Sequence, residues 1–180
     1  MLRNDVFSKT KGHEDFNWSM LGNIKEGRGD LGEETPVVVY RLMQYTMLDV
    51  LSKAYGLEQA NEHFRQAGFL AGTEFAKNTI DLTADLSGFI SSLQKAMQGL
   101  KIGILRVESF NVEDGNCVLT VGQDLDCSGL PITNETVCNY DMGFIAGILE
   151  LYTGKKYDVR EVDCWASGDR VCRFSGTVRA

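Results

Sequence analysis

Five cysteines are the residues of this 180-residue chain best suited to chemistry: Cys117, Cys127, Cys138, Cys164 and Cys172. Grouped cysteines in a chain of this size more often bind metal or do redox work than form a disulfide framework, when no signal peptide is evident. The sequence has only two histidines, His13 and His63. A metal site would therefore use mainly sulfur and carboxylate ligands, and a Ser/His/Asp catalytic triad is not convincing.

The last two cysteines face each other across a predicted hairpin whose turn is centred on Gly168. Directly opposed Cβ atoms of Cys164 and Cys172 would lie about 4.5–5.5 Å apart. Two sulfurs on a tetrahedral zinc, each about 2.3 Å from the metal, are roughly 3.8 Å apart. The register thus suits two metal-binding thiolates, but it suits a disulfide equally well.

Two further residues favour a metal over a disulfide. Cys138 is in line with the apolar stripe of a predicted helix that should pack on this sheet, and Glu161 lies three residues before Cys164. Strict alternation would place Glu161 on the opposite face of the strand, so a bulge or bend is required. The predicted ligand set is Cys138, Glu161, Cys164 and Cys172, which would form a closed, structural site. Buried, reduced cysteines without metal are the alternative at this point.

The remaining cysteines and a nearby acidic segment have simpler interpretations. We expect Cys117 in the core of the sheet, and Cys127 as a loop thiol with no partner at metal-binding spacing. Asp124 and Asp126 could suggest a loop that binds a hard cation, but no full calcium-loop pattern follows them. We expect a solvated turn there.

Hydrophobic periodicity predicts an α+β domain in which an antiparallel sheet packs against helices. Residues 1–35 are polar and Gly-rich and are expected to form an N-terminal extension, and residues 36–180 to form the domain. The Asp114-Gly115 pair is a strong hairpin signal. The predicted order is helices over about 37–55, 57–78 and 82–100, strands 103–110 and 116–121, a helix from about 134 to 153, and strands 157–165 and 170–178.

The first two predicted helices carry features of a helix-packing interface. Gly68 and Gly72 lie one turn apart and allow two backbones to approach closely, either within one chain or between subunits. The apolar stripe of the first helix includes Val39, Met43 and Met47. Because the stripes of both helices exceed what one small sheet can cover, we predict a homodimer through these helices.

Composition restricts the class of partner. Hydrophobic residues make up 43% of the chain and charged residues 24%, and the net charge is -7. An acidic chain without a basic stripe argues against nucleic acid or an anionic membrane as a main partner. No apolar run is long enough for a membrane span, and the start of the chain lacks the apolar stretch of a signal peptide. We therefore expect a cytoplasmic protein.

The C-terminal motifs resemble one family. The stretch Cys138-Asn-Tyr140, Gly143, Gly147, Gly154, Glu161-Val-Asp-Cys164, Gly168-Asp169 and Cys172-Arg-Phe174 resembles the 4-vinyl reductase domain family, and the resemblance extends over roughly residues 36–180. The N-terminal part looks like stand-alone archaeal or bacterial members. The family shares the fold of Golgi vesicle-tethering subunits and is related to the sensor domains of aromatic-sensing transcriptional activators.

The resemblance implies a zinc ion, a dimer and an apolar ligand. The sensors' pattern of one Cys, then Glu-x-x-Cys, then a final Cys falls on Cys138, Glu161, Cys164 and Cys172. A hydrophobic cavity is implied between helices and sheet, and the candidate lining residues are Met142, Ile145, Leu149 and Cys117.

The predicted function is a zinc-stabilised homodimer that binds or senses a hydrophobic or aromatic hydrocarbon-like molecule. The alternative is an enzyme or accessory subunit in the reduction of tetrapyrrole vinyl groups. The chain shows no glycine-rich nucleotide motif after a strand and no flavin signature, which favours binding over catalysis. Neither histidine has a clear claim to the position that reads the hydroxyl group in phenol sensors, so phenol itself is not the expected ligand.

Overall fold

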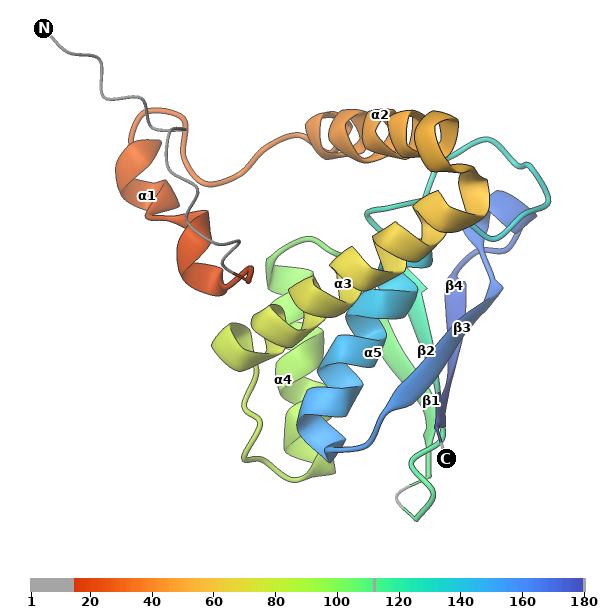
Figure 1. Cartoon of the computed structure of the whole chain (residues 1–180). Helices are drawn as coiled ribbons and strands as arrows, with labels where there is room; N and C mark the ends of the chain where they lie inside the picture. The colour runs from red at the N-terminus through yellow and green to blue at the C-terminus, as the bar shows by residue number, and fades with distance from the viewer. Residues whose placement is uncertain (1–14, 112, 180) are drawn as a thin grey trace, which may run out of the picture.

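A computed structural model describes residues 15–111 and 113–179 of the chain. It confirms the predicted α+β class, with helices packed against a four-stranded sheet (Figure 1). Short 3-10 turns at Trp18–Leu21 and Trp165–Ser167 accompany the regular elements. These elements are α1 (Ile24–Gly27), α2 (Val37–Tyr55), α3 (Leu57–Thr79), α4 (Leu86–Gly99), β1 (Ile104–Phe110), β2 (Cys117–Gly122), α5 (Asn139–Thr153), β3 (Tyr157–Asp163) and β4 (Cys172–Val178).

The sheet consists of two antiparallel hairpins that lie side by side in the order β1-β2-β4-β3. The central pair, β2 and β4, places Cys172 opposite Val121. The ladder between β3 and β4 shifts register between Glu161 and Asp163. This irregularity is the bulge predicted from the sequence, and it turns both Glu161 and Cys164 toward the buried side of the sheet.

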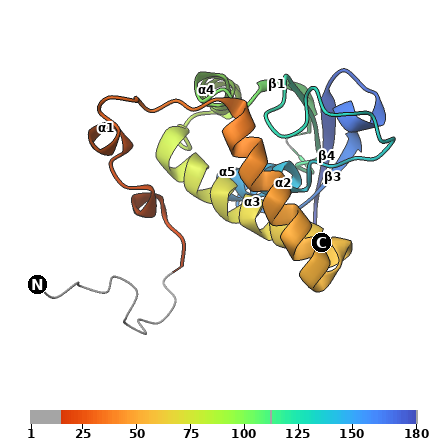
Figure 2. The same ribbon diagram turned by 90° about the horizontal axis from the view of Figure 1, so that it is seen from above.

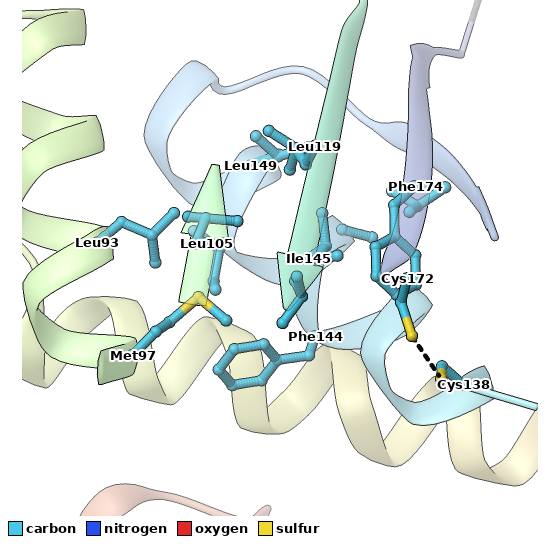
Figure 3. Close-up of a cluster of buried hydrophobic side chains, with 14 of the residues drawn as sticks. Leu93, Met97, Leu105, Leu119, Cys138, Phe144, Ile145, Leu149, Cys172 and Phe174 are labelled. Atoms are coloured by element: carbon cyan, nitrogen blue, oxygen red, sulfur yellow. Dashed lines mark hydrogen bonds between the residues drawn. The ribbon is translucent and has the colours of Figure 1, made fainter. Parts of the chain in front are cut away.

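One face of the sheet is covered by α3, α4 and α5, and the hydrophobic core lies between the two layers (Figure 1). Leu93 and Met97 from the predicted apolar stripe of α4 meet Leu105 of β1, and Ile145 and Leu149 of α5 lie beside β2 and β4 (Figure 3). The core ends at the cysteines, which belong to the same buried cluster. Among the described residues, no helix combines the length and hydrophobicity needed to cross a bilayer.

The crossing of α3 and α5 depends on glycines on both helices. A Cβ atom on Gly72 would overlap the backbone carbonyl of Phe144, and one on Gly143 would overlap the carbonyl of Arg65. Gly68 and Gly147 meet the facing backbone in the same way. The glycine face of α3 is thus covered within the chain, so these glycines do not form the dimer contact that the sequence suggested.

Helix α2 presents the face opposite to the one predicted. Its apolar stripe is exposed, with Val39 at 51%, Met43 at 62% and Met47 at 51% of full accessibility, whereas Gln44 is buried. Seen from above, α2 forms an outer layer across α3 (Figure 2). The polar side of α2 is turned inward because it hydrogen-bonds to the loop that follows β2, as described below.

Helix α5 begins later than predicted. Asn134 has a left-handed backbone with φ 62°, and its N–H donates to the carbonyl of Ala166, as does that of Thr133. Residues before Cys138 therefore pair with the β3–β4 connection instead of forming a first helical turn. Cys138 is the residue that precedes the helix, and it is not part of the helical stripe.

These contacts predict that Gly72→Ala will destabilise the fold. The added methyl group has only the backbone of α5 to displace, so the free energy of unfolding should fall by at least the roughly 1–3 kcal/mol typical of overpacking. The matched control is Gly99→Ala, at the end of α4, where a Cβ meets open space. Urea denaturation should show that variant unchanged or slightly stabilised. Equal stabilities of the two variants would contradict this account of the α3–α5 crossing.

Candidate metal centre

Four of the five cysteines converge at the end of the sheet nearest α2. The sulfurs of Cys127, Cys138, Cys164 and Cys172 all lie within 4.8 Å of one another, and all four side chains are buried. They come from four separate segments: the loop after β2, the residue before α5, the end of the bulged strand β3 and the first residue of β4. Strand pairing and helix packing together create this cluster.

The spacing of the sulfurs fits a tetrahedral metal ion. Cys138 Sγ lies 3.8 Å from Cys164 Sγ and 3.8 Å from Cys172 Sγ (Figure 3), which is the edge expected of a zinc–thiolate tetrahedron with bonds of about 2.3 Å. Cys127 Sγ is 3.0 Å from Cys172 Sγ. Each separation is well beyond a disulfide bond of about 2.05 Å, and all five cysteines are free thiols.

The prediction that Cys127 is an isolated loop thiol is wrong. Asp124 folds the loop back by accepting hydrogen bonds at Oδ1 from the backbone N–H groups of Asp126 (2.8 Å) and Cys127 (3.2 Å). This turn places the Cys127 sulfur in the cluster. The local signal was the aspartate three residues before the cysteine, because aspartate commonly caps such turns.

Glu161 touches the cluster through the backbone. Its Oε2 accepts a hydrogen bond of 2.9 Å from the N–H of Cys138, while its buried Oε1 has no hydrogen-bond partner. Burial raises the pKa of Glu161 to about 8. The carboxyl group therefore holds Cys138 in place, and its role as a metal ligand stays a prediction.

Three more carboxyl groups lie beside the thiols. Asp124, Asp126 and Asp141 are 3%, 3% and 8% exposed, so the expected solvated turn at 124–126 is wrong. Burial, followed by the charge of Asp126, raises the pKa of Asp124 to about 7. Burial and the charge of Asp124 likewise raise the pKa of Asp141. Only Asp126 is engaged by a side chain from outside the loop, since the hydroxyl of Tyr40 donates to its Oδ1 over 2.7 Å.

The thiols also shift one another's ionisation. Their mutual hydrogen bonds, that with Cys127 first, lower the pKa of Cys164 and raise that of Cys138. Hydrogen bonding to Cys127 and burial raise the pKa of Cys172 as well. A metal-free cluster therefore favours one thiolate with protonated neighbours. A bound divalent cation would allow the other thiols to ionise.

Helix α2 grips the loop that carries Cys127. Arg41 donates from Nε to the carbonyl of Leu125 and from Nη2 to that of Ser128, each over 2.9 Å. The hydroxyl of Tyr45 donates to the carbonyl of Asp126 over 3.0 Å. These bonds explain why the polar side of α2 faces inward. They also make the position of α2 depend on the loop of the metal centre.

The residues predicted to line a ligand cavity occupy two different environments. Ile145, Leu149 and Cys117 lie in the packed core and are 5%, 2% and 2% exposed. Met142 instead lines an open groove of about 380 Å³ between α3, α5 and β3, together with Phe69 and other residues. Its sulfur accepts a hydrogen bond of 3.3 Å from the N–H of Glu161.

Fold and site thus define an α+β domain with a buried, thiol-rich centre. Residues 117–178 match the family model of the vinyl-4-reductase domain, and this match confirms the resemblance expected from the sequence. An uncharacterised protein of Methanocaldococcus jannaschii is 26% identical over 144 residues, which are 80% of this chain and 76% of that protein.

Solved structures share the fold at lower identity. The phenol-responsive sensory domain of the transcription activator PoxR, solved with phenol, has a TM-score of 0.63 and 16% identity, covering 82% of this chain and 76% of that one. A vinyl-4-reductase family protein from M. jannaschii has a TM-score of 0.60 and 16% identity, with coverages of 83% and 85%. Trafficking protein particle complex subunit 3 from Naegleria fowleri, covalently bound to palmitic acid, has a TM-score of 0.57 and 12% identity, with coverages of 80% and 95%.

The cluster geometry predicts that Cys127→Ser will lower metal content. The hydroxyl of serine is a much poorer ligand than a thiolate, so at least a tenfold loss of zinc affinity is expected, within the range of 10–100-fold seen even for losses of outer-shell partners. Competition with a chelator followed by elemental analysis measures this loss. Cys117→Ser is the matched control, because Cys117 is equally buried but lies outside the cluster. If Cys127→Ser retains full affinity while Glu161→Gln loses it, the sequence-based ligand set is correct instead.

Proposed function

We propose that this chain is a zinc-stabilised domain that binds a hydrophobic or aromatic small molecule, acts as a homodimer and is not an enzyme. The observation that carries the proposal is the buried four-cysteine cluster, which connects the helix layer to the sheet of a vinyl-4-reductase-type fold. Each part of the proposal has its own support in the contacts of the described residues.

Zinc is the metal best matched to four thiol ligands. Four sulfurs from the protein would complete a tetrahedral shell and leave no open position for a substrate, which favours a structural role. The ligands would be Cys127, Cys138, Cys164 and Cys172. The set with Glu161 in place of Cys127 is the alternative that the variants above distinguish.

The groove beside Met142 is the proposed entry for the ligand. Its volume falls within the range of about 300–1,000 Å³ common for small-molecule sites. Apolar side chains of Phe69, Met142 and Val159 contribute to its lining. The proposed deeper contacts, Ile145, Leu149 and Cys117, would become accessible only if α5 moved away from the sheet. The phenol and palmitic acid in two proteins of the same fold support an apolar ligand.

A chain of contacts joins this groove to the metal centre. The Glu161 N–H bonds to the sulfur of Met142, and the Glu161 carboxylate bonds to the N–H of Cys138. A ligand that displaces Met142 would therefore strain the cluster, which in turn holds the loop gripped by α2. This arrangement supports sensing over catalysis. An accessory role in vinyl-group reduction, suggested by the family name, is the second outcome of the ligand test.

The exposed face of α2 supports the homodimer. Val38, Leu42, Met43, Met47 and Val50 each retain 51–62% of their full accessibility. Contiguous apolar patches of this kind on a folded chain mark interaction surfaces. We place the contact between two copies on α2, in agreement with the helices predicted from the sequence but not with the glycines.

The ligand proposal predicts stabilisation by apolar compounds. A thermal-shift screen of zinc-loaded protein against aromatic hydrocarbons, phenols and fatty acids should raise the melting temperature for one class, increasing with free ligand concentration. Met142→Trp should fill the groove and abolish the shift without loss of zinc, whereas Leu100→Trp, on an exposed site, should preserve it. No shift with any class, together with stimulation of a vinyl reductase, would favour the accessory-enzyme alternative.

The dimer proposal predicts a mass of about 40 kDa by light scattering, from two chains of 20.0 kDa. Leu42→Glu places a charge in the centre of the apolar face and should shift the protein to the monomer by at least tenfold in dissociation constant. Lys53→Glu, on the same helix but in an exposed i,i+4 ion pair, is the control that should leave the dimer intact. A wild-type monomer at micromolar concentration would refute the proposal.

A further inference from the structure

A second group of donor atoms lies against the four-thiol cluster. Asp124, Cys138 and Asp141 each offer one ligand atom, these atoms all lie within 4.8 Å of one another, and all three side chains are buried. Asp124 belongs to the loop after β2, Cys138 precedes α5, and Asp141 lies in the first turn of α5. Cys138 is a member of both groups.

This group carries negative charge that the described residues do not balance. Asp141 Oδ2 is buried without any hydrogen-bond partner. Among residues 15–111 and 113–179, no ion pair involves Asp124 or Asp141. Arg41, the basic residue that hydrogen-bonds to this loop, directs its guanidinium to backbone carbonyls. Asp124 is partly compensated by two backbone N–H groups at Oδ1.

A bound metal in the four-thiol cluster would not remove this charge. Four thiolates around one divalent ion already leave two excess negative charges, and ionised Asp124 and Asp141 would add two more. Burial of unpaired charge costs several kcal/mol per group in proteins, so such a centre requires either protons or a second cation. The two possibilities differ in metal stoichiometry.

We propose that Asp124, Cys138 and Asp141 bind a second divalent cation, with the Cys138 thiolate bridging the two ions. The inference rests on the proposed zinc in the four-thiol cluster. Two carboxylates and one thiolate form a mixed oxygen and sulfur donor set, which suits a borderline transition-metal ion such as Zn²⁺, Co²⁺ or Fe²⁺. It does not suit Ca²⁺ or Mg²⁺, which prefer oxygen ligands throughout. The second ion gives the unpartnered Asp141 oxygen a ligand and connects the start of α5 to the loop after β2.

Titration of reduced, metal-free full-length protein with Co²⁺ separates the two sites. The wild type should bind two equivalents. The first should produce the intense absorption of tetrahedral cobalt–thiolate coordination, and the second should alter the ligand-field bands as oxygen ligands are added. Asp141→Asn should bind one equivalent, with an unchanged first-equivalent spectrum that also proves the four-thiol site is folded. Asp126→Asn, an equally buried aspartate outside the donor group, should still bind two.

Each other outcome overturns a defined part of the account. One equivalent in the wild type, with the thiolate spectrum, refutes the second cation and leaves the proposed zinc centre intact, because the carboxyl groups are then held by protons. Two equivalents in Asp141→Asn refute the assignment of Asp141 as a ligand. No thiolate spectrum at any cobalt concentration refutes the zinc centre and the second cation together.

Discussion

The concentration of ionisable groups in one dry corner of the molecule constrains the rest of the structure. Four thiols and four carboxyl groups, those of Asp124, Asp126, Asp141 and Glu161, are buried where the loop after β2, the start of α5 and the β3–β4 hairpin meet. A buried polar group stabilises a fold only when a partner satisfies it. The backbone N–H groups of this corner provide part of that compensation, and a metal ion would provide the remainder.

The surrounding elements appear in an order set by this requirement. The bulge in β3 turns Glu161 and Cys164 to the same side, and the turn capped by Asp124 brings Cys127 to the sheet. Helix α2 then covers the loop with Tyr40, Arg41 and Tyr45. Because its polar side is used in this way, its apolar side is left at the surface. The same interaction that closes the metal centre thus creates the surface proposed for a second subunit.

Much of this architecture could be predicted from the sequence, because it depends on local patterns. The hairpin at Asp114-Gly115, the bulge before Cys164 and most helix limits follow from periodicity and turn chemistry. The place of Cys127 could not be predicted, since it depends on a fold-back of the loop and not on spacing along the chain. The burial of Asp124 and Asp126 was missed for the same reason. The face of α2 was misassigned because hydrogen bonds to the loop outweigh its apolar periodicity, and the α3–α5 contact resolved the two roles open to Gly68 and Gly72.

The central claim is that a metal ion in the cysteine centre stabilises the fold, and its most direct test is the free energy of unfolding measured across buffered free zinc concentrations. Binding to the native state alone predicts a rise of about 1.4 kcal/mol for each tenfold increase in free zinc above the dissociation constant, for each ion bound. Strong chelation should remove this stabilisation, and zinc should restore it. A free energy of unfolding that stays constant across the whole zinc range, in a chain that folds without metal, would contradict the account.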